Sequence, residues 1–303
     1  MYKTDTTTQT SARFVHYTTA EAAAKIITTK RLWMRNTTCM TDYREVRHGF
    51  DILSKFFLNK DKRSKFDEAF DACAPGIAQE AINSFNHWWQ NLQLGTFITS
   101  ISEHDERENV NGRLSMWRGF GGNAARVAMV LRVPSQTDAG NALSLMFSPV
   151  TYFTEPEAHE LLWEVIENVK RESAFLKTIE RSMLVANVFA VLILGVTCSK
   201  HEGFREEREW RAIYIPSMRS SPFMESSTEV IAGVPQIIHK LPLDEKLSPY
   251  LKDLELMNCF DRLIIGPSQF PLAMYEAFVA ALKQSGIADA EQRVVVSNIP
   301  IRT

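Results

Sequence analysis

The chain has 303 residues, of which 45% are hydrophobic and 23% are charged, a balance typical of globular proteins with a sizeable core. Its formal net charge of −2 gives no sign of a polyanionic partner such as duplex nucleic acid, so nucleic-acid contact would require a local basic patch. The four cysteines lie far apart without a CxxC pair, which excludes the usual zinc-site and disulfide-framework signatures.

The first predicted segment is a disordered tail at residues 1–10, which are polar and Thr-rich. They contain no apolar stretch of the kind that a secretory signal needs, so we expect a cytoplasmic protein. A strand is then expected to end at His16 and Tyr17, and Thr18 or Thr19 caps the helix that follows. A second strand is predicted over residues 32–35.

The middle of the chain predicts two helical insertions. Over residues 46–92, aromatic and aliphatic residues recur at three- and four-residue steps, which indicates helices whose aromatic side chains pack in a core. Strands are expected over residues 95–103, 127–133 and 150–153. A long amphipathic helix is expected over residues 156–182.

The stretch Met183–Cys198 carries no charge. It falls short of the roughly 18 apolar residues taken as the threshold for a membrane span, so it predicts a buried strand or core helix and no membrane association. A strand at residues 207–215, a helix at 272–284 and a final strand near 293–302 complete the chain. Strands and helices are mixed without regular alternation, which predicts an α+β fold with a mixed β-sheet core flanked by helices.

The stretch "EREWRAIYI", residues 207–215, is the main candidate for chemistry. On a strand, the side chains of Glu207, Glu209 and Arg211 leave the same face, because side-chain direction alternates. The alternative is an ion-paired row on a solvated sheet face, and spacing alone does not separate the two. The P-loop, GxGxxG, HExxH and GxSxG signatures are absent from the sequence.

Several short segments, taken in order, resemble one bacterial family of uncharacterised proteins, DUF2971. They are "HYTTAEAAAKIITTKRLWM" (16–34), "MTDYREVRHG" (40–49), "MWRGFGGNAARVAMVL" (116–131) and "EREWRAIYI" (207–215), followed by "LIIGP" and "SNIPIR". The resemblance runs from about Phe14 to Arg302. It implies a single α+β domain over residues 11–303, with the two helical insertions inside it and an ADP-ribosyltransferase-like arrangement.

The sequence departs from the family pattern at two places. Thr41-Asp42-Tyr43 replaces the usual Asn-Asp-Pro, and Phe120 stands where relatives have a Tyr after Met-Trp. A contact made by that Asn or by that Tyr hydroxyl in relatives is lost or replaced here.

The resemblance implies that the substrate is NAD. Cleavage of the nicotinamide–ribose bond builds positive charge on the ribose, which a carboxylate stabilises, and Glu209 fits that role. Glu207 would orient or deprotonate an acceptor. The resemblance places contacts with NAD on His16, Tyr17, Thr18, Asp42, Trp117, Arg118, Phe120 and Arg211. No residue is assigned to a metal.

Within this set, each role has a structural reason. His16 would bond the adenosine ribose, Trp117 and Phe120 would stack nicotinamide, and Arg118 or Arg35 would pair with the pyrophosphate.

Structural alternatives remain open for several of these residues. The alternative for His16 is a cap or hydrogen bond at the start of the neighbouring helix, and the alternative for Trp117 and Trp210 is core packing. The alternative for Asp42 and Glu45 is a turn.

Three functions follow as expectations. The first is an NAD-dependent ADP-ribosyltransferase-like enzyme, such as a bacterial toxin or antiphage effector, whose partners are NAD and a macromolecular acceptor of unknown identity. The second is an NAD glycohydrolase, and the third is a non-catalytic nucleotide-binding or protein-interaction module. The substitution Glu209→Gln is expected to abolish nicotinamide release while leaving thermal stability nearly unchanged.

Overall fold

The computed structural model describes residues 12–40, 45–119, 124–133 and 138–300. The predicted tail at residues 1–10 lies outside these ranges. The strands are β1 (Ala12–Thr19), β2 (Arg31–Asn36), β3 (Phe97–Glu103), β4 (Arg126–Val133), β5 (Met146–Pro149), β6 (Thr151–Phe153), β7 (Ser199–His201), β8 (Glu209–Tyr214), β9 (Glu225–Ile231), β10 (Val234–Pro242), β11 (Phe260–Ile265) and β12 (Val294–Val296).

Helices are interspersed among these strands. The α-helices are α1 (Ala20–Thr29), α2 (Glu45–Leu58), α3 (Lys60–Asp71), α4 (Ile77–Gly95), α5 (Leu114–Gly119), α6 (Asp138–Ala142), α7 (Glu155–Arg171), α8 (Ser173–Leu176), α9 (Arg181–Thr197), α10 (Leu256–Cys259), α11 (Pro271–Gln284) and α12 (Ala290–Arg293). The 3-10 helices are η1 (Thr37–Cys39), η2 (Glu106–Glu108), η3 (Glu202–Glu207), η4 (Glu245–Leu247) and η5 (Pro249–Leu254).

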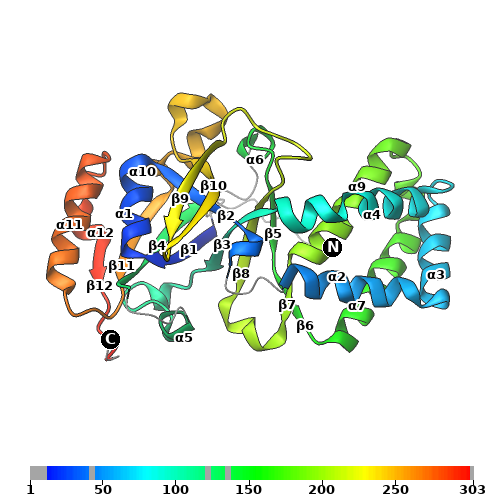
Figure 1. Ribbon diagram of the computed structural model, residues 1–303, viewed down its shortest axis with the longest axis horizontal. Coiled ribbons are helices and arrows are strands. Elements are labelled where there is room, and N and C mark those ends of the chain that lie inside the picture. Colours follow the sequence, from blue (N-terminus) through cyan, green and yellow to red (C-terminus); the bar gives the residue numbers. More distant parts are fainter. Residues whose placement is uncertain (1–11, 41–44, 120–123, 134–137, 301–303) are drawn as a thin grey trace.

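One large mixed sheet forms the centre of the molecule. Its strand order is β12-β11-β4-β1-β3-β2-β10-β9, and β8 pairs with β3 and β5. Among the described strands of this sheet, β11 pairs with β12 in parallel and the other pairs are antiparallel. Helices α1 and α11 lie at one side, whereas α2, α3, α4, α7 and α9 form a separate group beyond β5 and β8 (Figure 1). This arrangement confirms the predicted α+β class.

The opening of the chain folds as its sequence predicts. The Thr19 side chain caps α1 by accepting a hydrogen bond from the backbone N–H of Ala22 at 3.2 Å. Lys30 ends the helix in a left-handed conformation (φ 52°), and β2 starts at the next residue. Helix α1 buries Ile26 and Ile27 against the sheet.

The helical group has its own core. Residues 46–92 form α2, α3 and α4 as predicted, and the apolar stretch at 183–198 becomes α9, whose buried side chains join that core. Across the described ranges, no helix combines the length and apolar character that crossing a bilayer requires. The helix predicted over 156–182 is wrong at its C-terminal end, because Glu172 leaves the helical conformation (φ −93°, ψ 13°) and α7 stops at Arg171.

Strand β3 changes partners along one edge, and this positions the candidate site. Its C-terminal end, at Ser102, pairs with β1, whereas its first two residues pair with β2. Between these two ladders, a side chain connects β3 to β2: Thr99 Oγ1 donates to the Trp33 carbonyl at 2.8 Å. Along its other edge, β3 pairs with β8 over Phe97–Ser102.

The hairpin of β9 and β10 has no counterpart among the predicted elements. Its two-residue turn places Ala232 and Gly233 at φ 51° and 81°. Positive φ at both positions defines the type I′ geometry that hairpins favour, usually with Asn-Gly or Asp-Gly. Ala-Gly carries a weaker signal, so the sequence pattern did not indicate this turn.

Helices α2 and α9 approach closely at Gly49. A Cβ added there would lie 2.6 Å from the Val196 carbonyl oxygen and 2.9 Å from its Cα, and backbone atoms cannot rotate away. We therefore expect Gly49→Ala to lower the free energy of unfolding by about 1–3 kcal/mol. Urea titration measures this loss, and Gly195→Ala, where an added Cβ meets nothing within 4 Å, is the control that should not destabilise the protein.

Candidate functional site

A buried group of charged side chains lies where the sheet meets the helical group. Glu209 and Arg211 extend from β8, Lys200 from β7 and Ser100 from β3. Glu209 and Arg211 are both almost fully buried. Their side chains bond each other directly, which shows that they share one strand face, as the alternation in the sequence predicts.

The Glu209 carboxylate is fully engaged. Its Oε1 accepts from Ser100 Oγ at 2.5 Å and from Arg211 Nε at 2.7 Å. Its Oε2 accepts from Arg211 Nη2 at 3.1 Å and from Lys200 Nζ at 3.4 Å. Burial by itself raises the pKa of Glu209, but Arg211, Lys200 and Ser100 outweigh it and lower the pKa below the usual glutamate value. The carboxylate is therefore ionised at neutral pH.

Glu207 contacts this group from a different element than the one predicted. It ends η3 and does not lie on β8, because Arg208 adopts a left-handed conformation (φ 44°) that interrupts the strand alternation. The prediction that Glu207 shares a strand with Glu209 is wrong. Its carboxylate nevertheless lies 2.7 Å from Lys200 Nζ, so both acids meet at the same ammonium group.

His16 joins the group from the other side of β3. Its Nδ1 lies 2.9 Å from the Ser100 carbonyl oxygen, in the gap where β3 changes from one neighbour to the other. Burial lowers the pKa of His16, and the Ser100 contact offsets only part of this effect. Ser100 thus contacts His16 through its backbone and Glu209 through its hydroxyl. The two ends of the predicted site converge on one residue.

Two further residues hold the group in place. The backbone N–H of Glu209 donates to Tyr152 Oη at 2.8 Å, and Arg211 Nη1 donates to the Thr197 carbonyl at the end of α9 at 2.6 Å. Burial raises the pKa of Tyr152 to about 12, so this phenol stays protonated. Tyr152 lies directly opposite Lys200 in the short parallel ladder of β6 and β7.

Sequence reasoning did not identify Ser100, Tyr152 or Lys200. For Lys200 a signal existed, since it is the first charge after the charge-free stretch 183–198. If a lysine next to such a stretch is buried with it, its charge needs an acidic partner, because buried charges are paired. Ser100 and Tyr152 sit in unremarkable strand segments and have no comparable signal.

Two of the residues expected to contact NAD are packed inside the protein. The Trp117 side chain is buried, its Nε1 donates to the Asn111 carbonyl at 2.7 Å, and its ring meets that of Tyr17 edge-on at 5.0 Å. Tyr17 Oη accepts from the Arg113 N–H at 2.8 Å. These contacts favour the core-packing alternative for Trp117. Thr18 pairs with Val127 in the ladder between β1 and β4.

The remaining predicted residues lie apart from Glu209 or outside the described ranges. Arg118 is exposed at the end of α5. Arg35 donates to Gln236 Oε1 at 3.0 Å and to the Cys39 carbonyl at 2.6 Å. Asp42 and Phe120 lie outside the described residues, so the departures from the family pattern at these positions have no structural account.

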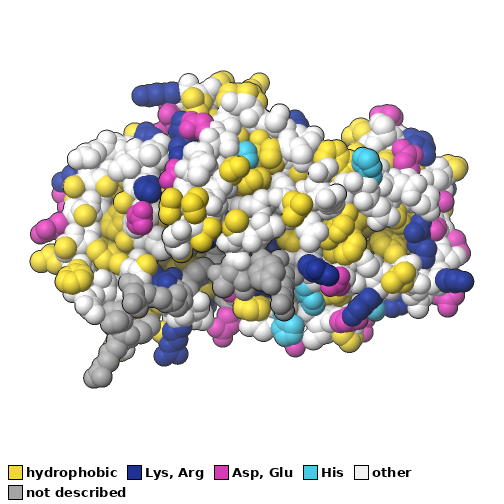
Figure 2. All heavy atoms as spheres, in the orientation of Figure 1, with side chains coloured by type: hydrophobic (Ala, Val, Ile, Leu, Met, Phe, Trp, Pro, Cys, Tyr) yellow, Lys and Arg dark blue, Asp and Glu magenta, His cyan; other side chains and the backbone are white. Residues whose placement is uncertain are grey.

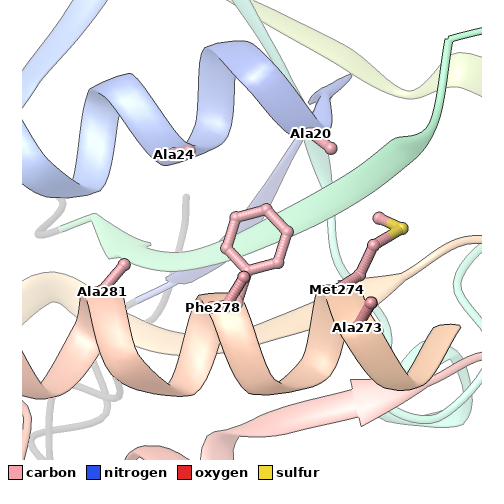
Figure 3. A pocket seen from close by; sticks show the side chains of 7 residues that line it. Ala20, Ala24, Ala273, Met274, Phe278 and Ala281 are labelled. Carbon is pink, nitrogen blue, oxygen red and sulfur yellow. The ribbon is translucent and has the colours of Figure 1, made fainter. Parts of the chain in front are cut away.

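Among the described side chains, Lys200 lies within ion-pair distance of both Glu207 and Glu209, and Arg211 pairs with Glu209. The ranges that the structure describes contain no cluster of three metal-ligating side chains. The hollow drawn in Figure 3 lies elsewhere, between α1 and α11; its volume is about 300 Å³ and its lining carries no titratable side chain.

One protein-family model matches the chain, over residues 116–212. The match is to DUF2971, described as a protein of unknown function. It confirms the resemblance to this family over residues 116–212, which contain the segment at 116–131 and most of the one at 207–215. The matched region contains Trp117, Glu207, Glu209 and Arg211, and His16 lies outside it. Comparisons with curated proteins and with solved structures found no match.

Proposed function

We propose that the protein is an NAD-cleaving enzyme with an ADP-ribosyltransferase-like site in which Glu209 is the catalytic carboxylate. The observation that supports this proposal most strongly is the convergence of His16 and Glu209 on Ser100, from three different strands. An enzyme of this kind needs an ionised carboxylate beside the ribose and a group that binds the far ribose. Glu209 and His16 are suited to these two roles.

In the proposed reaction, the bond between the ribose C1′ and the nicotinamide nitrogen breaks, and nicotinamide leaves neutral with the bonding pair. Glu209 stabilises the positive charge that develops on the ribose. The longest contact to Glu209 is that of Lys200 at 3.4 Å, so we expect a ribose hydroxyl to replace it. An acceptor then bonds to C1′ and its proton passes to Glu207, which is half-buried and adjacent to Lys200.

The acceptor in this proposal is a macromolecule, as expected of a bacterial toxin or antiphage effector. Without an acceptor, water would complete the same reaction and the protein would act as an NAD glycohydrolase. The two outcomes differ only in which nucleophile reaches C1′.

A specific observation favours a second, non-catalytic candidate. A carboxylate has about four lone-pair directions, and Glu209 already accepts four contacts. A side chain satisfied in this way holds β8 to β3 and β7 without any ligand. In this alternative the protein is a nucleotide-binding or protein-interaction module and the acids are structural.

Incubation with NAD carrying a label on its adenylate part tests the proposal. We expect free nicotinamide to accumulate, NAD to raise the melting temperature, and label to become fixed on macromolecules when cell lysate is added. In the Glu207→Gln variant, fixation of label should fall by about 10²–10⁴-fold, the usual contribution of a general base. Nicotinamide release to water should persist in this variant.

Glu206→Gln is the matched control, since Glu206 is the exposed neighbour of Glu207. It should behave as wild type in both assays. If the wild-type protein neither releases nicotinamide nor gains stability from NAD, the enzymatic proposal is wrong and the non-catalytic candidate stands.

A further inference from the structure

Three arginines converge on one buried aspartate at the end of the sheet formed by β1, β4 and β11. Arg13 Nη1 lies 3.4 Å from Asp261 Oδ2, Arg262 Nε lies 3.2 Å from the same oxygen, and Arg132 Nη2 bonds the other oxygen. The register shift in β11 between Phe260 and Arg262 leaves Asp261 as the extra residue of a bulge. Bulges re-aim side chains in this way, often beside functional sites.

The charge in this cluster does not balance. Three guanidinium groups carry three positive charges, and Asp261 carries one negative charge. Among the described residues, the other acid that pairs with these arginines is Glu106, whose carboxylate lies 3.9 Å from Arg13 and is almost fully exposed, so it contributes little. The remaining neighbours are neutral: Asn109 Oδ1 accepts from Arg13 at 3.1 Å and its backbone carbonyl accepts from Arg262 at 3.4 Å.

The placement of the arginines is itself unfavourable in the absence of an anion. Arg13 and Arg132 are directly opposite each other in the ladder between β1 and β4, and like charges in that position destabilise a sheet. Arg132 is half-exposed and Arg262 is partly exposed, so their outer N–H groups face solvent. Asp261 fixes the guanidinium groups before any ligand arrives, which reduces the entropy lost on binding.

A histidine next to this cluster adds no positive charge to it. The His104 imidazole is buried, with Nε2 2.9 Å from Asn109 Oδ1. Its Nδ1 lies 3.8 Å from Glu108 Oε2 and has no hydrogen-bond partner among the described residues. The pKa of His104 is lowered chiefly by burial; Arg13 and Arg262 lower it further, whereas Asn109 and Glu108 raise it. Because the net shift is downward, the imidazole is neutral at neutral pH, and the excess positive charge comes from the arginines.

We propose that Arg13, Arg132 and Arg262 form a binding site for a compact phosphate-bearing anion, such as a diphosphate. Guanidinium groups bind phosphate oxygens through paired hydrogen bonds, for which arginine is better suited than lysine. A compact anion fits better than an extended nucleic acid, because the chain carries a net charge of −2. On the face drawn in Figure 2, basic side chains are interspersed with acidic ones and form no continuous stripe. The site does not depend on the proposed NAD chemistry.

Calorimetric titration with pyrophosphate at low ionic strength tests this site, since salt screens exposed charges. We expect binding to the wild-type protein and affinity about tenfold lower in Arg132→Gln and in Arg262→Gln, the loss of one charge-assisted hydrogen bond. The matched control is Arg107→Gln, since Arg107 is exposed on the neighbouring η2 and pairs with Asp105. Its affinity should equal that of wild type.

Two further measurements identify the source of the phosphate and check that the variants are folded. Tighter binding of ADP than of pyrophosphate assigns the site to nucleotides, and equal binding assigns it to free polyphosphate; both support the site. Without ligand, Arg132→Gln also loses its bond to the buried Asp261, so a melting curve is recorded for each site variant and affinities are compared only at temperatures where the variant stays folded. The proposal is overturned if wild type does not bind pyrophosphate, or if both site variants bind it as tightly as wild type. It is also overturned if the protein binds single-stranded DNA but not pyrophosphate.

Discussion

The substitution Glu209→Gln is expected to lower the free energy of unfolding by about 3–5 kcal/mol, because it breaks the buried ion pair between Glu209 and Arg211. The sequence alone leads to the opposite expectation of nearly unchanged stability, which requires Glu209 to be free of such contacts. Urea unfolding at neutral pH measures the change. Loss of nicotinamide release in this variant is therefore interpretable only at temperatures where the variant stays folded.

The same ion pair gives stability a defined pH dependence. The folded-state pKa of Glu209 is lowered, so its contribution is present above the unfolded-state pKa. That contribution is lost as the pH falls through the lowered folded-state value. The wild-type protein should lose this stability in acid, and Glu209→Gln should lack that part of the pH dependence.

Two controls separate the buried charge from general damage. Glu160 is exposed on α7, so Glu160→Gln should change stability by less than about 0.5 kcal/mol. The double variant Glu209→Leu/Arg211→Met removes both charges together, and replacing a whole buried pair with apolar groups is often neutral. The proposed role of the ion pair is wrong if Glu209→Gln is as stable as wild type. It is also wrong if the double variant loses as much free energy of unfolding as the two single substitutions together.

The substitution Phe56→Ala is expected to destabilise the protein by about 3–5 kcal/mol. Phe56 is completely buried at the centre of the helical group, where its ring meets those of Phe57 at 5.5 Å and Trp163 at 6.0 Å. Truncation leaves a cavity that rigid helices cannot close. Chemical denaturation gives the magnitude, and Phe175→Ala on α8, where the phenyl ring is mostly exposed, should have little effect.

Calorimetry on Phe56→Ala also tests the prediction of a single domain over residues 11–303. The hydrophobic core of the helical group also includes Ile98 of β3 and Ile213 of β8, and a second core lies where α1 and α11 pack on the sheet. Arg211 adds a hydrogen bond from β8 to the end of α9. If the domain is one cooperative unit, a single transition shifts to lower temperature. Two transitions, of which only one moves, would show that the insertion unfolds independently.

Local signals in the sequence were sufficient for much of the fold. The Thr cap at Thr19 is confirmed, and the strand predicted over 95–103 forms as β3 from Phe97 onward, because the signals that define them lie within a few residues. Sequence patterns gave the wrong result, or none, where single residues adopt an unexpected backbone conformation. The left-handed Arg208 removes Glu207 from β8, and Ala232-Gly233 forms a hairpin turn without the usual residues.

The candidate site shows the same division. Alternation along β8 was enough to place Glu209 and Arg211 together, since neighbours on a strand face are fixed by backbone geometry. Ser100 is 84 residues from His16 and 109 from Glu209. No periodicity within a segment specifies contacts over that separation.

The sequence by itself determined the α+β class, the resemblance to DUF2971, most of the helices and strands, and the pairing of an acid with an arginine on one strand face. All of these depend on composition, on local backbone preference or on the alternation of side chains. Only the tertiary structure decided that Lys200 contacts both acids, that Trp117 is buried, and that three arginines share Asp261. These features arise because distant strands are brought side by side, and burial and charge balance are properties of that packed arrangement.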